Sequence, residues 1–593
     1  MIIGRIAKVD GIKAVGIFFD RLPPHLLFQG EISPAPQINT FVKTRVGLDI
    51  VVCQIVGEHE FEYDKEKQQK SQATEATGPF LVDLEVRGRI VGEEFKGGLR
   101  CLPIVGAKLE TLTNQDHRSL FSVKGQAIRI GNNLFDSNNS IYLDVNKLMP
   151  SHIGIFGNTG SGKSNTITKL LKEYLEIIPP DSNNVKILIF DLNNEYGGNA
   201  ITSIDSKQVY PLTTRKKTEA ITEAEKIPLD FQLLSEDNWG TILRATQKTQ
   251  MPVIRRASKR WINGLTEEDC VRQISHMLVN KRSQMFLTLR EYGGEFFTGI
   301  DDIAYNKTTE GFYYQSESGS VYINTSNDVR EIKLVNIPDV FDRFLLCLLF
   351  EIAASSESGT NFDYIQPLLP RARAAFIDLK KTFVDSTGIE ITEIFLDKPL
   401  AVIQLGNVSV STRETIPSLI SDLLFQHCVT ARKDDRPKAI YSIVVDEAHN
   451  ILASDTTEHN DLIHDNTLRV FERVIKEGRK FGVFLYIASQ RPSDISSTIT
   501  SQIHNYFIHK LVNPNDIERI RKTVSFMGDS SLSLLSALGQ GECIVSGPSL
   551  YMPQYVYVDE LDNESKPNSS DIVLFGDNGL FNNFSDSVER VSI

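Results

Sequence analysis

The chain has 593 residues, 41% of them hydrophobic, and this length predicts roughly three to four globular domains. Its formal net charge of −13 argues against a generally basic protein that coats nucleic acid, although a local basic channel stays compatible with it. The sequence shows no signal peptide, no apolar run long enough to cross a bilayer and no zinc-ligand spacing among its six cysteines. We therefore expect a cytoplasmic protein without membrane contact.

Residues 1–108 alternate between apolar and polar side chains with a period near two. Clear examples are the segments 2–9, 48–56 and 81–87, which glycines separate from one another. Short alternating strands with glycine turns predict a small N-terminal β-barrel or sandwich. The almost entirely polar segment 63–77 predicts a loop, whose lysines could touch a phosphate backbone but are more typical of a solvated surface.

A phosphate-binding loop follows an apolar run at 153–156 and opens a segment of helical periodicity that ends before Pro179. The loop fits the pattern G-x-x-x-x-G-K-[ST] and comprises Gly157, Asn158, Thr159, Gly160, Ser161, Gly162, Lys163 and Ser164. Backbone N–H groups can surround phosphate oxygens there, Lys163 can reach the β- and γ-phosphates, and the Ser164 hydroxyl can ligate Mg²⁺. We predict that these residues and the adjacent Asn165 bind ATP, with a glycine-rich turn without a nucleotide as the alternative.

Two carboxylates follow the next predicted strand, which covers residues 185–190. Asp191 ends this strand, and Glu195 lies shortly after it. At the C-terminal end of a parallel strand, such side chains point into the ligand crevice, so both are candidate site residues. A turn built from Asp, Asn and Gly explains the pattern equally well, and both interpretations stay open. This strand belongs to the first part of a predicted α/β ATPase core, residues 109–210.

The alternation of strands and helices is lost over residues 211–398. Helical periodicity at 267–282 and 339–355 predicts a large, mostly helical insertion in the core. The insertion contains the most basic cluster of the chain, which runs from Arg255 to Arg260. Contact with nucleic acid and a solvated helix face are both possible roles, and the second is slightly favoured.

The predicted core resumes at residues 399–560. An apolar strand at 440–445 ends in Asp446 and Glu447, and a further strand at 483–489 is followed by Gln490. The carboxylate pair suits ATP hydrolysis, because Asp446 can hold Mg²⁺ through its water shell and Glu447 can polarise the attacking water. Gln490 can sense the γ-phosphate. The other elements expected in this part are strands at 400–405, 506–511 and 542–545 and helices at 416–431 and 470–480.

The tail, residues 561–593, begins polar and acidic and becomes apolar again near its end. A linker that carries a short docking segment fits this composition, and a frayed terminus fits it as well.

Five segments together resemble the HerA-type ATPases of the HerA/FtsK superfamily. They are GNTGSGKSNT from residue 157, DLNNEY from 191, VVDEAHN from 444, EGRKFGVFLYIASQRPS from 477 and LGQGECIVSG from 538. The resemblance implies a RecA-like P-loop core, an N-terminal HAS barrel, and a homo-hexamer that hydrolyses ATP between subunits while double-stranded DNA passes through its central pore.

The resemblance also implies roles for individual residues. Lys163 and Glu447 take part in catalysis, Gln490 couples the γ-phosphate to movement, and Arg479 reaches the ATP of the neighbouring subunit, with Arg473 as the second choice for this role. Where the family often has an arginine before the histidine that precedes the P-loop strand, this sequence has Ser151.

Relatives of this kind work with a separate effector, either a nuclease or a sirtuin-like NAD-consuming enzyme, in anti-phage defence or DNA end processing. The resemblance therefore predicts an ATP-driven translocase or helicase with such a partner. Two alternatives stay open. One is a hexameric scaffold that ATP stabilises and that clusters an effector, and the other is a conjugation-type or protein-export ATPase, although no membrane segment is seen in the sequence.

Overall fold

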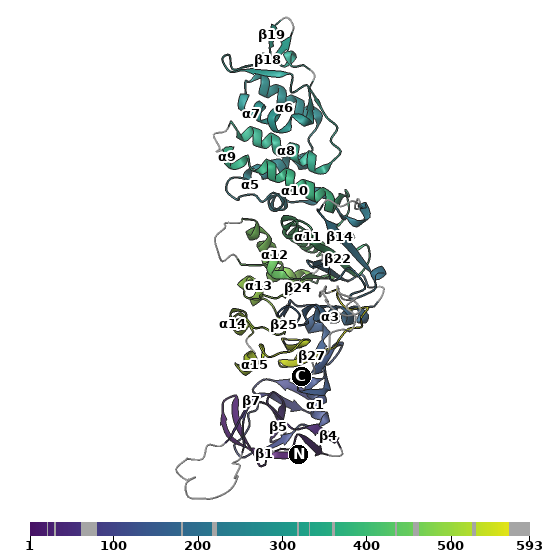
Figure 1. The fold of residues 1–593 in the computed structure, drawn as a ribbon, viewed down its shortest axis with the longest axis vertical. Helices are drawn as coiled ribbons and strands as arrows, with labels where there is room; N and C mark the ends of the chain where they lie inside the picture. Colours follow the sequence, from purple (N-terminus) through teal and green to yellow (C-terminus); the bar gives the residue numbers. More distant parts are fainter. Residues whose placement is uncertain are drawn as a thin grey trace, which may run out of the picture.

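The structure is a computed structural model that describes residues 1–20, 22–28, 31–60, 80–179, 182–215, 222–316, 319–330, 332–357, 362–432, 436–454, 462–524 and 529–568. The predicted loop at 63–77 and the apolar end of the tail lie outside these residues. The molecule is elongated, with the N-terminal strands at one end, the insertion at the other and a large sheet between them (Figure 1).

The N-terminal strands close into a six-stranded barrel, which confirms the prediction. Its strands are β1 (Ile2–Asp10), β2 (Lys13–Phe18), β5 (Phe41–Val46), β6 (Asp49–Glu60), β7 (Phe80–Val91) and β9 (Lys108–Thr111). They follow the order β2-β1-β9-β5-β6-β7, and the pairing of β2 with β7 closes the ring. Buried and less buried residues alternate along β7, because alternate side chains enter the barrel. The short strand β8 (Glu94–Gly97) pairs with β7 outside the ring, and β3 (His25–Phe28) pairs with β4 (Glu31–Pro34).

The core is one eleven-stranded sheet in the order β11-β10-β27-β26-β25-β12-β24-β23-β13-β22-β14. Its parallel part comprises β25 (Asn505–Ile508), β12 (Ile153–Phe156), β24 (Val483–Ser489), β23 (Ile440–Val445), β13 (Val185–Asp191), β22 (Leu400–Asn407) and β14 (Lys207–Thr213). The antiparallel part comprises β26 (Glu542–Ser546), β27 (Gln554–Val558), β10 (Ala127–Asn133) and β11 (Asp136–Asp144). The sequence predicted a strand at each position except β10, β11, β14 and β27.

Helices cover both faces of this sheet. The helix α3 (Lys163–Ile177) packs on one face, and α12 (Leu462–Phe481) packs on the other, as Figure 1 shows. Every residue of β12 and β24 is therefore buried, which explains why both strands read as continuous apolar runs in the sequence.

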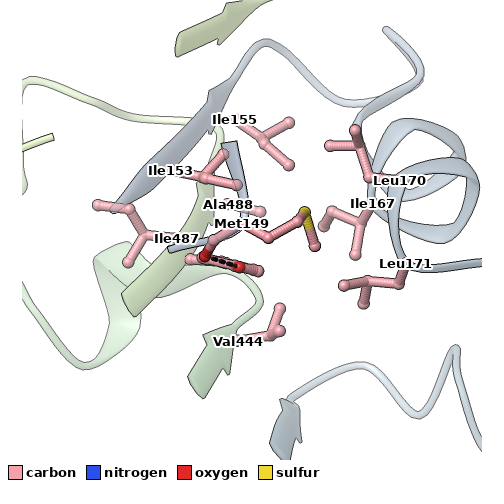
Figure 2. A pocket seen from close by; sticks show the side chains of 10 residues that line it. Met149, Ile153, Ile155, Ile167, Leu170, Leu171, Val444, Ile487 and Ala488 are labelled. Atoms are coloured by element: carbon pink, nitrogen blue, oxygen red, sulfur yellow. Dashed lines mark hydrogen bonds between the residues drawn. The ribbon is translucent and has the colours of Figure 1, made fainter. Parts of the chain in front are cut away.

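A small apolar cavity of about 10 Å³ lies between α3 and the sheet (Figure 2). Leu170 and Leu171 of α3 face Ile153 and Ile155 of β12 across it. At its edge, the Tyr486 hydroxyl donates a hydrogen bond of 2.6 Å to the Met149 carbonyl. A space of this size holds at most about one water molecule, so α3 is closely packed and its N-terminus is fixed relative to β12.

The helix α11 (Val410–Ala431) begins earlier than the predicted segment 416–431. A proline inside a helix usually removes one hydrogen bond and clashes with the preceding turn. The structure carries the helix through Pro417, which is buried, and Ser409 caps the first turn by accepting a hydrogen bond from the Thr412 N–H. Burial and the N-cap together outweigh the local preference.

The insertion between β14 and β22 is mostly helical. Its helices are α4 (Glu236–Ile242), α5 (Met251–Asn263), α6 (Glu267–Val279), α7 (Ser283–Gly293), α8 (Val340–Ser355), α9 (Phe362–Ile365) and α10 (Leu368–Thr382). A three-stranded sheet of β17 (Ile303–Asn306), β18 (Gly311–Ser316) and β19 (Gly319–Tyr322), which the sequence did not predict, lies near the far end of the molecule (Figure 1). The most apolar helix, α8, is buried inside the insertion, and no helix of the described chain has the length and apolar composition to span a membrane.

The basic cluster joins two helices of the insertion. Arg256 and Arg260 of α5 both donate to the Glu351 carboxylate of α8, at 2.9 Å and at 2.6–3.0 Å, respectively. Arg255 forms an ion pair of 3.3 Å with Glu236. Three cations of the cluster are therefore engaged within the chain, and their geometry supports packing rather than contact with nucleic acid.

A buried ion pair connects the barrel to the core. Lys43 of β5 donates to Asp116 of α1 (Asn114–Phe121), and both side chains are almost completely buried. Burial alone would raise the pKa of Asp116, but hydrogen bonds from Lys43 and Thr113 outweigh it and lower this pKa. The carboxylate is therefore ionised at neutral pH, and it holds both the lysine and the first turn of α1.

We predict that Asp116→Asn loosens the junction between barrel and core, because it leaves the Lys43 ammonium buried without a counter-charge. Such a loss costs about 3 kcal/mol, so the backbone amides of α1 should exchange about a hundredfold faster with deuterium. Mass spectrometry of the exchanging peptides measures this, with Glu176→Gln on the exposed side of α3 as the matched control. Equal exchange in both variants would contradict the role of the ion pair.

Candidate functional site

The loop between β12 and α3 has the backbone of a phosphate cradle. Gly160 and Gly162 have φ angles of 71° and 108°, which side-chain-bearing residues rarely adopt. At Gly157 space is the constraint, since a Cβ would lie 2.5 Å from the Cβ of His509 and 2.6 Å from the Ser161 Oγ. The loop leads directly into the N-terminus of α3, whose free N–H groups carry partial positive charge. This arrangement suits a bound phosphate.

A buried histidine and a glycine support the loop from behind. His509 donates from Nδ1 to the Glu542 carbonyl at 3.0 Å, and its Nε2 accepts from the Thr166 hydroxyl at 3.0 Å. This tautomer follows from chemistry, because a carbonyl can only accept. Burial, together with the nearby Lys163 charge, lowers the pKa of His509 to about 4, so the ring is neutral at pH 7. Gly541 adds a hydrogen bond of 3.0 Å from its N–H to the Ser161 carbonyl.

Lys163 lies at the start of α3 and is buried in the crevice. Its Nζ donates to the Asn158 carbonyl of the loop at 3.2 Å. Burial lowers the pKa of Lys163, while the carboxylates of Glu447, Asp446 and Glu195 partly offset this effect. These electrostatic effects indicate that the lysine, the acidic pair and Glu195 surround one space at the C-terminal ends of the parallel strands.

Asp446 and Glu447 follow β23 at this edge. The Asp446 Oδ1 accepts from the Glu447 N–H at 2.9 Å, whereas its buried Oδ2 has no hydrogen-bond partner in the described part of the chain. Burial raises the pKa of Asp446, and the charges of Glu195, Glu447 and Asp191 raise it further. A buried carboxylate with an unpartnered oxygen is costly unless a cation balances it. Oxygen donors of this kind fit Mg²⁺, which also prefers to be shared with phosphates.

The structure separates the roles of Asp191 and Glu195. Both carboxylate oxygens of Asp191 accept N–H groups of the following turn, those of Glu195 and Tyr196, each at 2.9 Å. Asp191 therefore builds a turn, as one of the two interpretations expected. The Glu195 carboxylate is half-buried and its Oε2 has no partner within the described residues. Its charge acts on both Lys163 and Asp446, so Glu195 belongs to the crevice.

Gln490 follows β24 and connects the acidic pair to the phosphate loop. Its Nε2 donates to the Glu447 Oε1 at 2.5 Å, and its Oε1 accepts from the Thr159 hydroxyl at 2.5 Å. Three residues that are far apart in the sequence thus form one chain of hydrogen bonds. The carboxyl ends of β12, β23 and β24 lie next to one another in the sheet, which brings these residues together.

Ser164 and Asn165 differ in where they point. Ser164 lies beside the buried phenol of Tyr196 in the crevice. The Asn165 side chain instead donates to the Asp559 carbonyl at 3.1 Å. Residues 559–568 continue along α3, where the Ser565 hydroxyl accepts from Lys172 at 3.2 Å, so this stretch does not leave the core as a linker.

Arg479 lies at the opposite end of the parallel strands, where their N-termini are. It is exposed near the C-terminus of α12, beside His152, which precedes β12. Burial, followed by the charges of His504 and Arg479, lowers the pKa of His152 to about 4. The four residues of β12 separate His152 from the phosphate loop by about 13 Å along the strand. Arg479 is therefore remote from the crevice of its own chain.

Arg473 is held within the chain. Its guanidinium donates to the buried Asp422 carboxylate of α11 and lies over the Phe425 ring at 4.9 Å. The second oxygen of Asp422 accepts from Asn238 of the insertion at 2.8 Å. Arg473 thus joins α12 to α11 and, through Asp422, to α4, so its guanidinium is engaged within the chain.

Comparisons with known proteins identify similar chains and one matching family. The family model described as "Helicase HerA, central domain" matches residues 128–424. The DNA double-strand break repair helicase HerA of Sulfurisphaera tokodaii is 25% identical over 479 residues, which cover 79% of this chain and 76% of the relative. A probable helicase of Methanocaldococcus jannaschii is 24% identical over 507 residues, covering 85% and 82%. The solved structure of VirB4 of Thermoanaerobacter pseudethanolicus aligns at 12% identity with a TM-score of 0.41, covering 75% of this chain and 99% of that one.

From the pKa values of two buried histidines we predict that the free energy of unfolding falls in acid. His509 and His152 each have a folded pKa of about 4, while the unfolded value is about 6.5. Between these pH values the unfolded chain binds more protons than the folded chain. The stability that the neutral histidines contribute is therefore fully present above pH 6.5 and is lost as the pH drops towards 4. Each histidine should lower the free energy of unfolding by on the order of 2 kcal/mol between pH 7 and pH 5.

Chemical denaturation at the two pH values measures this drop. We expect His509→Gln to reduce it by about 2 kcal/mol, because glutamine can keep both hydrogen bonds without titrating. An undiminished drop in this variant would show that His509 does not contribute.

Proposed function

This chain belongs to the HerA helicase family and is a P-loop ATPase, and on this premise we propose that it is one subunit of a ring-shaped motor that moves along double-stranded DNA. The observation that carries the proposal is a separation within the chain. Lys163 and Glu447 lie at the C-terminal ends of the parallel strands, and Arg479 lies at their N-terminal ends. Each chain then holds one half of two catalytic sites.

We assign the first half to the crevice around Lys163. The loop N–H groups and Lys163 bind the β- and γ-phosphates of ATP, and Ser164 and Asp446 hold the accompanying Mg²⁺, which neutralises phosphate charge when it is bound. Glu447 orients and polarises the attacking water, and Gln490, which contacts the Glu447 carboxylate, senses the γ-phosphate. Glu195 adds a third carboxylate beside the metal position, which accounts for its unpartnered oxygen.

We assign the second half to Arg479. An arginine stabilises the charge that develops on a transferred phosphoryl group, and it can be supplied by a neighbouring molecule. When one edge of a subunit meets the opposite edge of the next, the contact is heterologous, and such contacts close into a ring if the rotation allows it. The family resemblance supports six subunits and a central pore for double-stranded DNA.

The names of the relatives, which refer to repair of DNA double-strand breaks, suggest the process in which the motor acts. We propose that the motor acts in the cytoplasm in DNA end processing or anti-phage defence, with a separate effector that is a nuclease or a NAD-consuming enzyme. The net charge of −13 favours a second candidate, a hexameric scaffold that ATP stabilises and that clusters the effector with little movement on DNA.

A pair of variants tests the ATPase role. We predict that Lys163→Ala abolishes ATP binding, because the phosphates lose their main cation, whereas Glu447→Gln keeps binding and loses turnover by on the order of a thousandfold or more. Calorimetric titration and a phosphate-release assay with and without DNA, at stated ionic strength, measure both effects. Tight ATP binding by Lys163→Ala would contradict the role of the lysine. Full effector activity with Glu447→Gln would favour the scaffold.

We further predict that Arg479→Ala keeps ATP affinity but lowers turnover by a factor on the order of a thousand. Mixing it with Glu447→Gln subunits should restore part of the activity, since some interfaces then combine an intact crevice with an intact arginine. Lys480→Ala, one residue further along α12, is the matched control and should keep full turnover. No rescue in the mixture would show that Arg479 does not act between subunits.

A further inference from the structure

The hydrogen bonds around Gln490 fix which atoms carry the protons. The Gln490 Nε2 donates a hydrogen bond to the Glu447 Oε1, so the amide nitrogen of Gln490 faces the carboxylate. The amide oxygen of Gln490 must then face Thr159, at 2.5 Å, and this oxygen can also only accept. The Thr159 hydroxyl is therefore the donor, and its single proton is used in this contact.

The same hydroxyl lies in the loop that receives the phosphates. Thr159 is exposed at the mouth of the crevice, two positions after the constricted Gly157 and next to Gly160, which has a positive φ angle. Phosphate oxygens accept hydrogen bonds and do not donate them when ionised. A phosphate between the loop and Glu447 therefore competes with Gln490 for one proton, because a hydroxyl has only one to give.

We propose that Thr159 is a positioning residue that reports the terminal phosphate of a nucleoside triphosphate to Glu447. Without the terminal phosphate, Thr159 holds the Gln490 amide, and this amide holds the Glu447 carboxylate. When the terminal phosphate binds, it takes the Thr159 proton, the Gln490 oxygen loses its donor, and the amide is free to reorient. Glu447 is then released to act on water only when a triphosphate is present.

This inference rests on the proposed ATPase function and adds a requirement to it. Nucleotide binding must break the hydrogen bond between Thr159 and Gln490. This cost weakens binding only when both residues are present, so it appears as a coupling between the two substitutions. The sign of this coupling is informative. If Thr159 and Gln490 instead only cooperated in holding the phosphate, removing either one would weaken the contribution of the other, and the coupling would have the opposite sign.

A double-mutant cycle in the full-length protein tests the coupling. The dissociation constant of a non-hydrolysable ATP analogue is measured for the wild type, Thr159→Val, Gln490→Leu and the double variant. We expect the product of the wild-type and double-variant constants to exceed the product of the single-variant constants by roughly threefold to tenfold, the effect of one neutral hydrogen bond. A ratio of one or less overturns the proposal.

Two further measurements make the test specific. Thr159→Ser keeps a hydroxyl and should restore the coupling that Thr159→Val removes, and thermal melting checks that all variants are folded. ADP lacks the terminal phosphate, so its ratio should stay near one, and an equal ratio for ADP would overturn the assignment to that phosphate. Normal ATP turnover without coupling refutes only this inference, whereas wild-type protein that does not bind the ATP analogue refutes the proposed function.

Discussion

The balance of buried charge around Lys163 constrains this molecule more than any other interaction. One ammonium group and the carboxylates of Asp446, Glu447 and Glu195 share a crevice where water is largely excluded, and burial shifts the pKa values of Lys163 and Asp446 in opposite directions. Several polar atoms in this arrangement lack hydrogen-bond partners, and a ligand with phosphate and a divalent cation would supply them. The rest of the core holds these groups in place.

The support of the crevice comes from both parts of the eleven-stranded sheet. The parallel strands bring the carboxyl ends of β12, β23 and β24 together. His509 directly follows β25 and Gly541 directly precedes the antiparallel strand β26, and both lie behind the phosphate loop. The neutral His509 leaves no room for a side chain at Gly157. Apolar side chains of α3 and of the sheet line the small cavity between them (Figure 2).

The parts that were predicted well have strong local signals. The P-loop pattern, the apolar strands that end in carboxylates and the long helix α8 each follow from a few consecutive residues. The strands β10, β11, β14 and β27 were missed because they lie at or beyond the edges of the parallel sheet and have weaker apolar runs. The helix α11 shows the same limit, because it begins at Val410, after the Ser409 cap, and not at the predicted residue 416.

The sequence by itself determined the chemistry of the crevice, since a glycine-rich loop, a lysine and two adjacent carboxylates fit few other reactions. Only the tertiary structure decided how these groups cooperate. It assigned Asp191 to a turn and Glu195 to the crevice, joined Thr159 to Glu447 through Gln490, and placed Arg479 at the N-terminal ends of the parallel strands. The reason is physical: such relations depend on strand order and on buried neighbours distant in the chain, and no local pattern of residues encodes them.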